Sequence, residues 1–274
     1  MRSAYSWFRP PPSPTGEMPF FDHLEELRWR IIWSLLALVA GTGIGFFVAR
    51  RLDLLGLLKR PLDPYIDGDQ LIALSITDPF FITFKLALTL GFILAAPVII
   101  YQVWLFLAPA LTKRERRAIV PALYMGVALF CIGVVVAYRY VLPLTAMFLA
   151  GFQTESLTLT MTGTLYFGFV IKLLVAFGLV FQLPVVILIL ASLGLVSSKF
   201  LASKRRYAVA VMTVTAALIT PGDVASTILM MVPLLLLYEL SIILTRLVER
   251  NRARHAAADA AAEAAADAAT VEAQ

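Results

Sequence analysis

Two carboxylates in basic surroundings, Glu26 and Glu115, have the most scope for chemistry in this sequence. Asp22, Glu26 and Arg30 share one face of a predicted helix, and Glu115 stands among four cations at 113–117 (KRERR). The chemistry that such groups offer is ion pairing. Taken alone, the residues favour local pairs, with Glu26 bound to Arg30 at i,i+4 spacing and Glu115 neutralised inside a basic loop.

Signatures of catalysis are absent from the sequence: it contains no H-E-x-x-H, no G-x-S-x-G and no Gly-rich phosphate loop. The single cysteine, Cys131, permits no internal disulfide. The two histidines, His23 and His255, stand at opposite ends of the chain and argue against a His-built metal site. We therefore expect no enzyme, no metal and no cofactor, and the basic residues show no nucleic-acid footprint.

The composition predicts a membrane protein. Of 274 residues, 60% are hydrophobic and 15% are charged, whereas soluble domains carry about 25% charged residues. A helix that crosses a hydrocarbon core of about 30 Å needs roughly 20 residues. Apolar intervals of that length occur at 31–49, 86–112, 118–138 and 165–198, the last of which includes Lys172. We predict an all-α, polytopic fold.

Two further helices are predicted in the interval 207–238, whose only charge is Asp223. At 1.5 Å per residue this interval would form a helix of about 48 Å, too long for one crossing. Pro221 and Gly222 divide it, so the fifth helix has only about 14 to 16 residues and the sixth runs over about 226–244. The total is six transmembrane helices.

The distribution of the 23 Lys and Arg residues predicts the topology. Sixteen lie in the two tails and in the second and fourth loops, and six lie in the other loops. By the positive-inside rule both termini are cytoplasmic, and the net charge of +5 indicates contact with anionic lipid. We expect a disordered extension at 1–17, a membrane domain at 18–250, and an Ala-rich acidic tail at 251–274 that is either a weak solvated helix or disordered.

Glycines and prolines predict how the helices pack and bend. Gly41 and Gly45 form a G-x-x-x-G pair, for which we favour close internal packing over self-association. Four prolines lie within or beside apolar spans, where each removes a helix hydrogen bond: Pro97, Pro143, Pro184 and Pro233. Curved helices and a concave wall should result.

Several motifs, found in order along the chain, resemble the TatC family, the multispanning core of the twin-arginine protein translocase. They are HLEELR at 23–28, APVIIYQVWLFLAPAL at 96–111, ERR at 115–117, AFG at 176–178 with FQLP at 181–184, and TPGD at 220–223. The resemblance covers roughly 19–250. It implies a glove-like six-helix fold in the cytoplasmic (inner) membrane of a prokaryote, with both termini inside.

The resemblance also implies a receptor for signal peptides that carry two adjacent arginines on folded cargo. The residues that match the family's receptor site are Glu26, Arg28, Phe106, Glu115 and Arg116. A carboxylate suits this task because the planar fork of a guanidinium pairs with it bidentately, a geometry that an ammonium cannot copy. Single-span TatA and TatB types are the implied partners, the receptor complex contains several copies of the chain, and the proton-motive force drives export.

A docking region for the partner helix is implied around Gln182, Met212, Thr213, Thr215 and Thr227. Several relatives carry a buried glutamate where this chain has Gln182, which cannot titrate. The alternative for Gln182 is a helix–helix hydrogen bond worth about 0.6 kcal/mol. The alternative for the threonines is a hydrogen bond to their own helix backbone.

Polar residues near the outer surface and inside the spans have mainly structural interpretations. The loop 50–84, with Pro61 and Asp78, predicts an ordered cap with short helices, and Asp223 is expected to cap the sixth helix or to act in function. For Lys172 we favour snorkelling to the outer interface over an ion pair. For Glu239, close to Arg246, we favour a structural pair over proton relay.

The rival function is a proton-coupled secondary transporter of a small anion, with Glu239 or Lys172 as the coupling residue. Such folds usually show interrupted helices in matching positions of two repeats. Here only the fifth and sixth helices are short. An intramembrane enzyme is a third possibility, without a catalytic set to support it.

Overall fold

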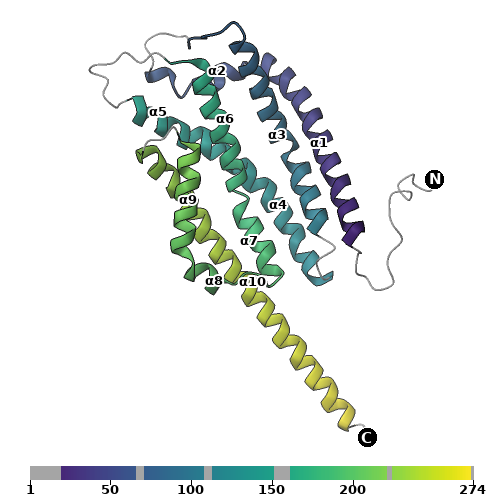
Figure 1. Ribbon diagram of the computed structural model, residues 1–274. Coiled ribbons are helices and arrows are strands. Elements are labelled where there is room, and N and C mark those ends of the chain that lie inside the picture. Colours follow the sequence, from purple (N-terminus) through teal and green to yellow (C-terminus); the bar gives the residue numbers. More distant parts are fainter. Residues whose placement is uncertain (1–19, 66–70, 108–112, 151–160, 221–223, 273–274) are drawn as a thin grey trace, which may run out of the picture.

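The chain is described here by a computed structural model and folds into a bundle of helices (Figure 1). The structure describes residues 20–65, 71–107, 113–150, 161–220 and 224–272, so the predicted extension 1–17 lies outside the described residues. The α-helices are α1 (Phe20–Arg51), α2 (Leu54–Lys59), α3 (Asp78–Leu107), α4 (Lys113–Val136), α5 (Leu142–Ala150), α6 (Gly163–Val180), α7 (Leu183–Ser192), α8 (Ser198–Ser203), α9 (Arg205–Ile219) and α10 (Val224–Glu272).

Within the described ranges, five helical stretches are long and apolar enough to cross a membrane. They are His23–Arg51, Asp78–Phe106, Leu123–Leu149, Gly163–Ser192 and Met230–Arg254. The third joins α4 to α5 through a π-helical turn, and the fourth joins α6 to α7. Helix α9, with 15 residues, is shorter than these and has the length predicted for the fifth helix. The structure is thus an all-helical, multi-span membrane protein.

Two helix ends differ from the sequence prediction. Helix α3 begins at Asp78 and not near residue 86, because a single Lys85 interrupts the apolar pattern without interrupting the helix, and Pro79 suits a first helical turn. Helix α10 does not end near residue 244 but continues to Glu272. Alanine, the best helix former, dominates this last stretch. Of the two alternatives for the tail, the structure has the helix.

Two of the four prolines lie beside an irregularity in their helix. Pro184 lies in the first turn of α7, directly after the interruption at Phe181 and Gln182. Pro143 follows the π-helical turn Ala137–Val141. Pro97 and Pro233 lie inside α3 and α10, which continue through them.

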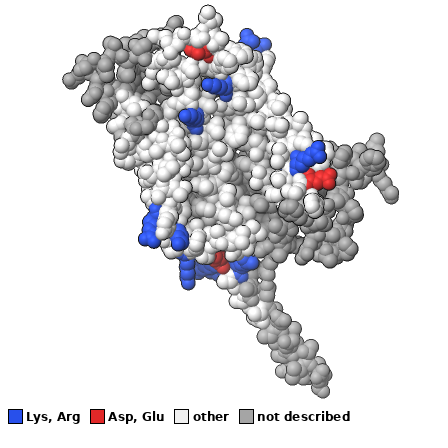
Figure 2. All heavy atoms as spheres, in the orientation of Figure 1, with Lys and Arg blue, Asp and Glu red and all other residues white. Residues whose placement is uncertain are grey.

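The helices form one bundle, from one end of which α10 projects. Helices α1 and α3 lie side by side, and α10 packs against α7 and α9 (Figure 1). The start of α1 and the projecting part of α10 point toward the same end of the bundle. In Figure 2, Lys and Arg side chains gather where α10 leaves the bundle, whereas most of the middle of this face is uncharged.

Glycines bring α1 and α3 into backbone contact. A Cβ atom added to Gly41 would lie 2.6 Å from the carbonyl oxygen of Gly91, and one added to Gly45 would lie 2.5 Å from that of Ala87. From the other side, a Cβ at Gly91 would lie 2.5 Å from the Cα atom of Thr42. The G-x-x-x-G pair therefore packs inside the chain, which confirms the expected internal packing.

We expect Gly91→Ala and Gly41→Ala to force α1 and α3 apart and to destabilise the protein by about 1–3 kcal/mol, the usual cost of overpacking. Gly43→Ala is the matched control, because nothing lies within 4 Å of its added Cβ. Unfolding midpoints measured in detergent should fall for the first two variants only. Equal midpoints for Gly91→Ala and Gly43→Ala would disprove the close contact.

Candidate functional site

The start of α1 places two side chains, those of His23 and Arg30, around the carboxylate of Glu26. The guanidinium Nη2 of Arg30 donates a hydrogen bond to Oε1 of Glu26. The imidazole Nδ1 of His23 lies 3.8 Å from Oε2 of the same carboxylate. These residues stand at i, i+3 and i+7 from His23, so one helical face presents all of them. The local pair predicted for Glu26 and Arg30 is present.

Helix α3 contributes an aromatic ring to this cluster from its last turn. The ring of Phe106 stacks on the imidazole of His23, with the ring centroids 4.3 Å apart and the planes inclined by 16°. The structure thus brings together Glu26 and Phe106, which are 80 positions apart in the chain. His23 links them; the sequence placed it at the start of the HLEELR motif but assigned it no part in the site. Its i,i+3 spacing from Glu26 was the available signal.

One oxygen of Glu26 is left without a hydrogen-bond donor. Oε2 is buried and accepts no hydrogen bond from any described residue. The His23 nitrogen at 3.8 Å is too distant to supply one. A buried acceptor left unmet costs about 1–3 kcal/mol, and more when it is charged. Oε2 therefore has unused capacity for an N–H donor, and the adjacent Arg30 Nε is a buried donor that likewise lacks a partner among the described residues.

The other receptor-site residues lie on neighbouring parts of the fold. Arg28 is exposed on α1, away from the buried side of Glu26. Glu115 and Arg116 belong to the first turn of α4, but their side chains lie outside the described residues. Only residues 108–112 separate the end of α3 from the start of α4. A carboxylate in a first helical turn is stabilised by the helix dipole, which suits Glu115.

Gln182 forms a hydrogen bond between helices. Its Nε2 donates to the backbone carbonyl of Gly126 in α4 at 2.9 Å, from the junction between α6 and α7. The structure thus contains the helix–helix bond that was the alternative to partner docking. The residue missed by sequence reasoning is Gly126, since nothing local in the sequence relates two positions 56 apart.

The residues expected to dock a partner helix divide into buried and exposed groups. Met212 is buried in the core of the chain, with 6% of its surface exposed, so it is a packing residue here and not a surface contact. Thr213 and Thr215 donate to the carbonyls of Val209 and Val211 in their own helix. The Thr227 hydroxyl lies 3.0 Å from that of Thr220. Thr213 and Thr215 thus make the backbone bonds that the alternative predicted, whereas the bond of Thr227 is to a side chain at the end of α9 and not to its own helix backbone.

The expected outer cap is ordered by hydrogen bonds to the helices. Asp78 accepts the backbone N–H groups of Leu74 and Ser75, at 2.9 and 3.1 Å, and so fixes the turn before α3. Pro61 is half-buried next to α2. The hydroxyl of Tyr166 in α6 donates to the carbonyl of Leu58, which holds α2 against the bundle. Asp223 lies outside the described residues.

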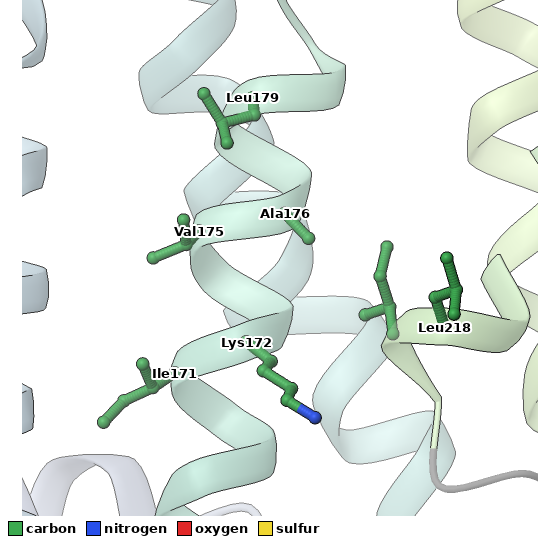
Figure 3. Close-up of a pocket in the computed structure, with 7 residues that line it drawn as sticks. Ile171, Lys172, Val175, Ala176, Leu179 and Leu218 are labelled. Atoms are coloured by element: carbon green, nitrogen blue, oxygen red, sulfur yellow. The ribbon is translucent and has the colours of Figure 1, made fainter. Parts of the chain in front are cut away.

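The two charged residues considered for ion coupling have different surroundings. Glu239 pairs with Arg205 of α9 at 2.8 Å, and both side chains are about half exposed. The favoured structural pair exists, although its partner comes from another helix and not from the nearby Arg246. Lys172 is exposed on α6 beside an apolar hollow between α6 and α9 (Figure 3).

Together, these features define a class: a multi-pass helical membrane protein with a buried carboxylate oxygen that lacks a donor at one end of its bundle. Comparison with known proteins also indicates a multi-pass membrane protein and names its family. The family profile described as "Sec-independent protein translocase protein (TatC)" matches residues 22–233. The TatC protein of Aquifex aeolicus is 43% identical over 237 residues, which cover 86% of this chain and 98% of that one. The TatC protein of Escherichia coli K12 is 38% identical over 229 residues, 83% of this chain and 88% of that one.

A solved structure extends the likeness to three dimensions. The crystal structure of a twin-arginine translocase receptor, TatC, superposes with a TM-score of 0.74 at 43% identity, over 82% of this chain and 98% of that one. The chain belongs to the TatC family. It is therefore a component of a protein translocase and not an enzyme.

Proposed function

We propose that this chain is the signal-peptide receptor and core of a twin-arginine translocase that exports folded proteins. The observation that carries this proposal is the Glu26 cluster, in which one carboxylate oxygen is buried and lacks a donor. A guanidinium from the peptide would supply that donor in a charge-assisted bond. Glu115 and Arg116, on the turn that begins α4, would form the second half of the site, and Arg28 and Phe106 its rim.

The proposed topology puts this site in the cytoplasm. The start of α1 and the projecting part of α10 lie toward one end of the bundle, where basic side chains gather. In the inner membrane of a prokaryote, that end would face inward by the positive-inside rule. Helix α9 would be the short fifth crossing and α10 the sixth, which gives six crossings with both termini inside. The π-helical turn before Pro143 and the interruption before Pro184 support the proposed concave wall.

The proposed partners are single-span proteins of the TatA and TatB types, membrane lipids and further copies of this chain, with export driven by the proton-motive force. The surface of α9 and α10 at Thr213, Thr215 and Thr227 is the proposed docking edge, and these residues are each partly exposed. Because Met212 is buried, we assign it a supporting role behind that edge.

For Gln182 we expect substitution to affect stability slightly and, if the residue serves docking, to affect partner assembly strongly. Gln182→Leu removes the bond to Gly126 and should lower stability by about 0.6 kcal/mol, the average for such bonds in membranes. If Gln182 also serves docking, the leucine variant will fail to assemble with the TatA-type partner, whereas Gln182→Glu, which in its protonated form can still donate, will retain export. Normal export by the leucine variant would leave Gln182 a structural role only.

The proposal is tested by peptide binding to the full chain in lipid nanodiscs. A fluorescent signal peptide with two arginines should bind, and the same peptide with two lysines should bind much more weakly, since an ammonium lacks the guanidinium fork. The rival transporter is tested in parallel by uptake of small anions into vesicles that contain the chain. Equal binding of both peptides, together with solute uptake, would favour the rival.

A further inference from the structure

Apart from the Glu26 cluster, the structure has a hollow between α6 and α9 that combines apolar walls with one charged side chain. It is an open surface depression of about 370 Å³, and its walls are apolar apart from Lys172. Val175 and Leu179 line it from α6, and Leu218 lines it from α9 (Figure 3). In Figure 3 the Lys172 side chain leaves α6 on the side where α9 ends. An elongated apolar molecule with a negative end matches this arrangement.

Lys172 needs an anionic partner that the described part of the chain does not provide. No ion pair or hydrogen bond joins it to any described residue, although Lys59, Arg30 and Arg205 each pair with a carboxylate. A charged group at membrane depth is costly unless it is paired or reaches the interface. The four-carbon stem of Lys172 can pack along the apolar walls while its ammonium pairs with an anion near the interface.

The short α9 explains how a lipid phosphate could reach Lys172. Lys172 is nine positions after the start of α6, or about 13 Å along the helix axis. Helical side chains tilt toward the N-terminus, here toward the end that carries α2. The 15 residues of α9 cover only about 22 Å, well short of a hydrocarbon core of about 30 Å. In Figure 1 the α9–α10 end stops below the α2 end, so headgroups beside it would lie closer to Lys172.

We propose that this hollow is a binding site for an anionic phospholipid, which places an acyl chain between α6 and α9 and its phosphate on the Lys172 ammonium. The site is independent of signal-peptide recognition. We place the lipid in the extracytoplasmic leaflet, toward the end that carries α2, and only this choice of leaflet rests on the proposed topology. Such a lipid would fill the gap that the short helix leaves in the bundle wall and would fix the separation of α6 and α9.

The test is native mass spectrometry of the full chain released from nanodiscs that contain phosphatidylglycerol and phosphatidylcholine in equal amounts. We expect Lys172→Met to lower the retained ratio of anionic to neutral lipid roughly fivefold, about what one lysine contributes at an anionic surface. Lys172→Arg should retain the lipid. Ala176→Leu, which fills the hollow without removing the charge, should also lose it.

Lys85→Met is the matched control, because Lys85 is an exposed lysine on α3 that does not line the hollow. An unchanged lipid ratio in Lys172→Met overturns the proposal, and this is the result expected if Lys172 instead pairs with Asp223 or with a partner helix. An equal loss in Lys85→Met also overturns it, since the lipid would then follow net charge. Peptide binding should be unaffected in every variant, which separates this proposal from the receptor function.

Discussion

Glu26→Ala is expected to weaken binding of a twin-arginine signal peptide by roughly 10- to 100-fold, because a hydrogen bond to a charged group is worth about 1.5–3 kcal/mol. The buried Oε2 of Glu26 is the acceptor that such a peptide would engage. Glu115→Ala should weaken binding similarly, and so should replacement of both peptide arginines by lysine. The measurement is fluorescence anisotropy of a labelled peptide titrated with the full chain in nanodiscs.

Glu25→Ala is the matched control for this experiment. Glu25 is the neighbouring carboxylate and is exposed, so its loss changes the net charge equally without touching the cluster. The unfolding midpoint of Glu26→Ala should remain well above the assay temperature, since the variant loses only the pair with Arg30 and the longer contact with His23. Unchanged affinity in Glu26→Ala, or an equal loss in Glu25→Ala, contradicts the assignment.

Lengthening α9 and the start of α10 by about one turn each is expected to reduce transport strongly while leaving peptide binding intact. Insertions before Ile219 and after Ile228 would extend α9 from about 22 Å to about 28 Å and remove most of the mismatch with the bilayer. The hypothesis is that a thinned bilayer beside α9 and α10 helps to open a path for folded cargo. Transport is measured with a folded reporter in membrane vesicles.

The control insertion is one turn of alanine after Ala258, in the part of α10 beyond the candidate span Met230–Arg254. It should leave transport unchanged. Spin labels along α9, read by depth-dependent accessibility, report the bilayer directly. A full-thickness bilayer around the unmodified helices would rule out the thinning hypothesis, whatever the insertions do to transport.

The long helices could be predicted from the sequence because lipid imposes a simple length rule on apolar stretches. The rule failed where one charge did not interrupt a helix, as at Lys85 in α3, and where a helix continued beyond its apolar stretch, as in α10 beyond residue 254. Close packing at Gly41 was also predictable, since glycine spacing on one helix is a local signal. Its partner Gly91 was not, because that contact depends on the fold.

The candidate site was predictable only in part, because several of its contacts join different helices. The pair of Glu26 with Arg30 follows from i,i+4 spacing within one helix. The stacking of His23 on Phe106 and the bond from Gln182 to Gly126 join different helices, and no local pattern encodes them. The partner of Glu239 shows the limit clearly: proximity in sequence favoured Arg246, whereas packing of α9 against α10 supplies Arg205.

The most direct test of the receptor function is a site-specific photocrosslink from the signal peptide to this chain. A photoreactive residue placed next to the two arginines should crosslink to the cluster formed by His23, Glu26 and Phe106, and the crosslink should disappear when both arginines are lysine. Crosslinks to the α2 end of the bundle, or crosslinks that persist with the lysine peptide, would contradict the proposal that this carboxylate cluster recognises the signal peptide.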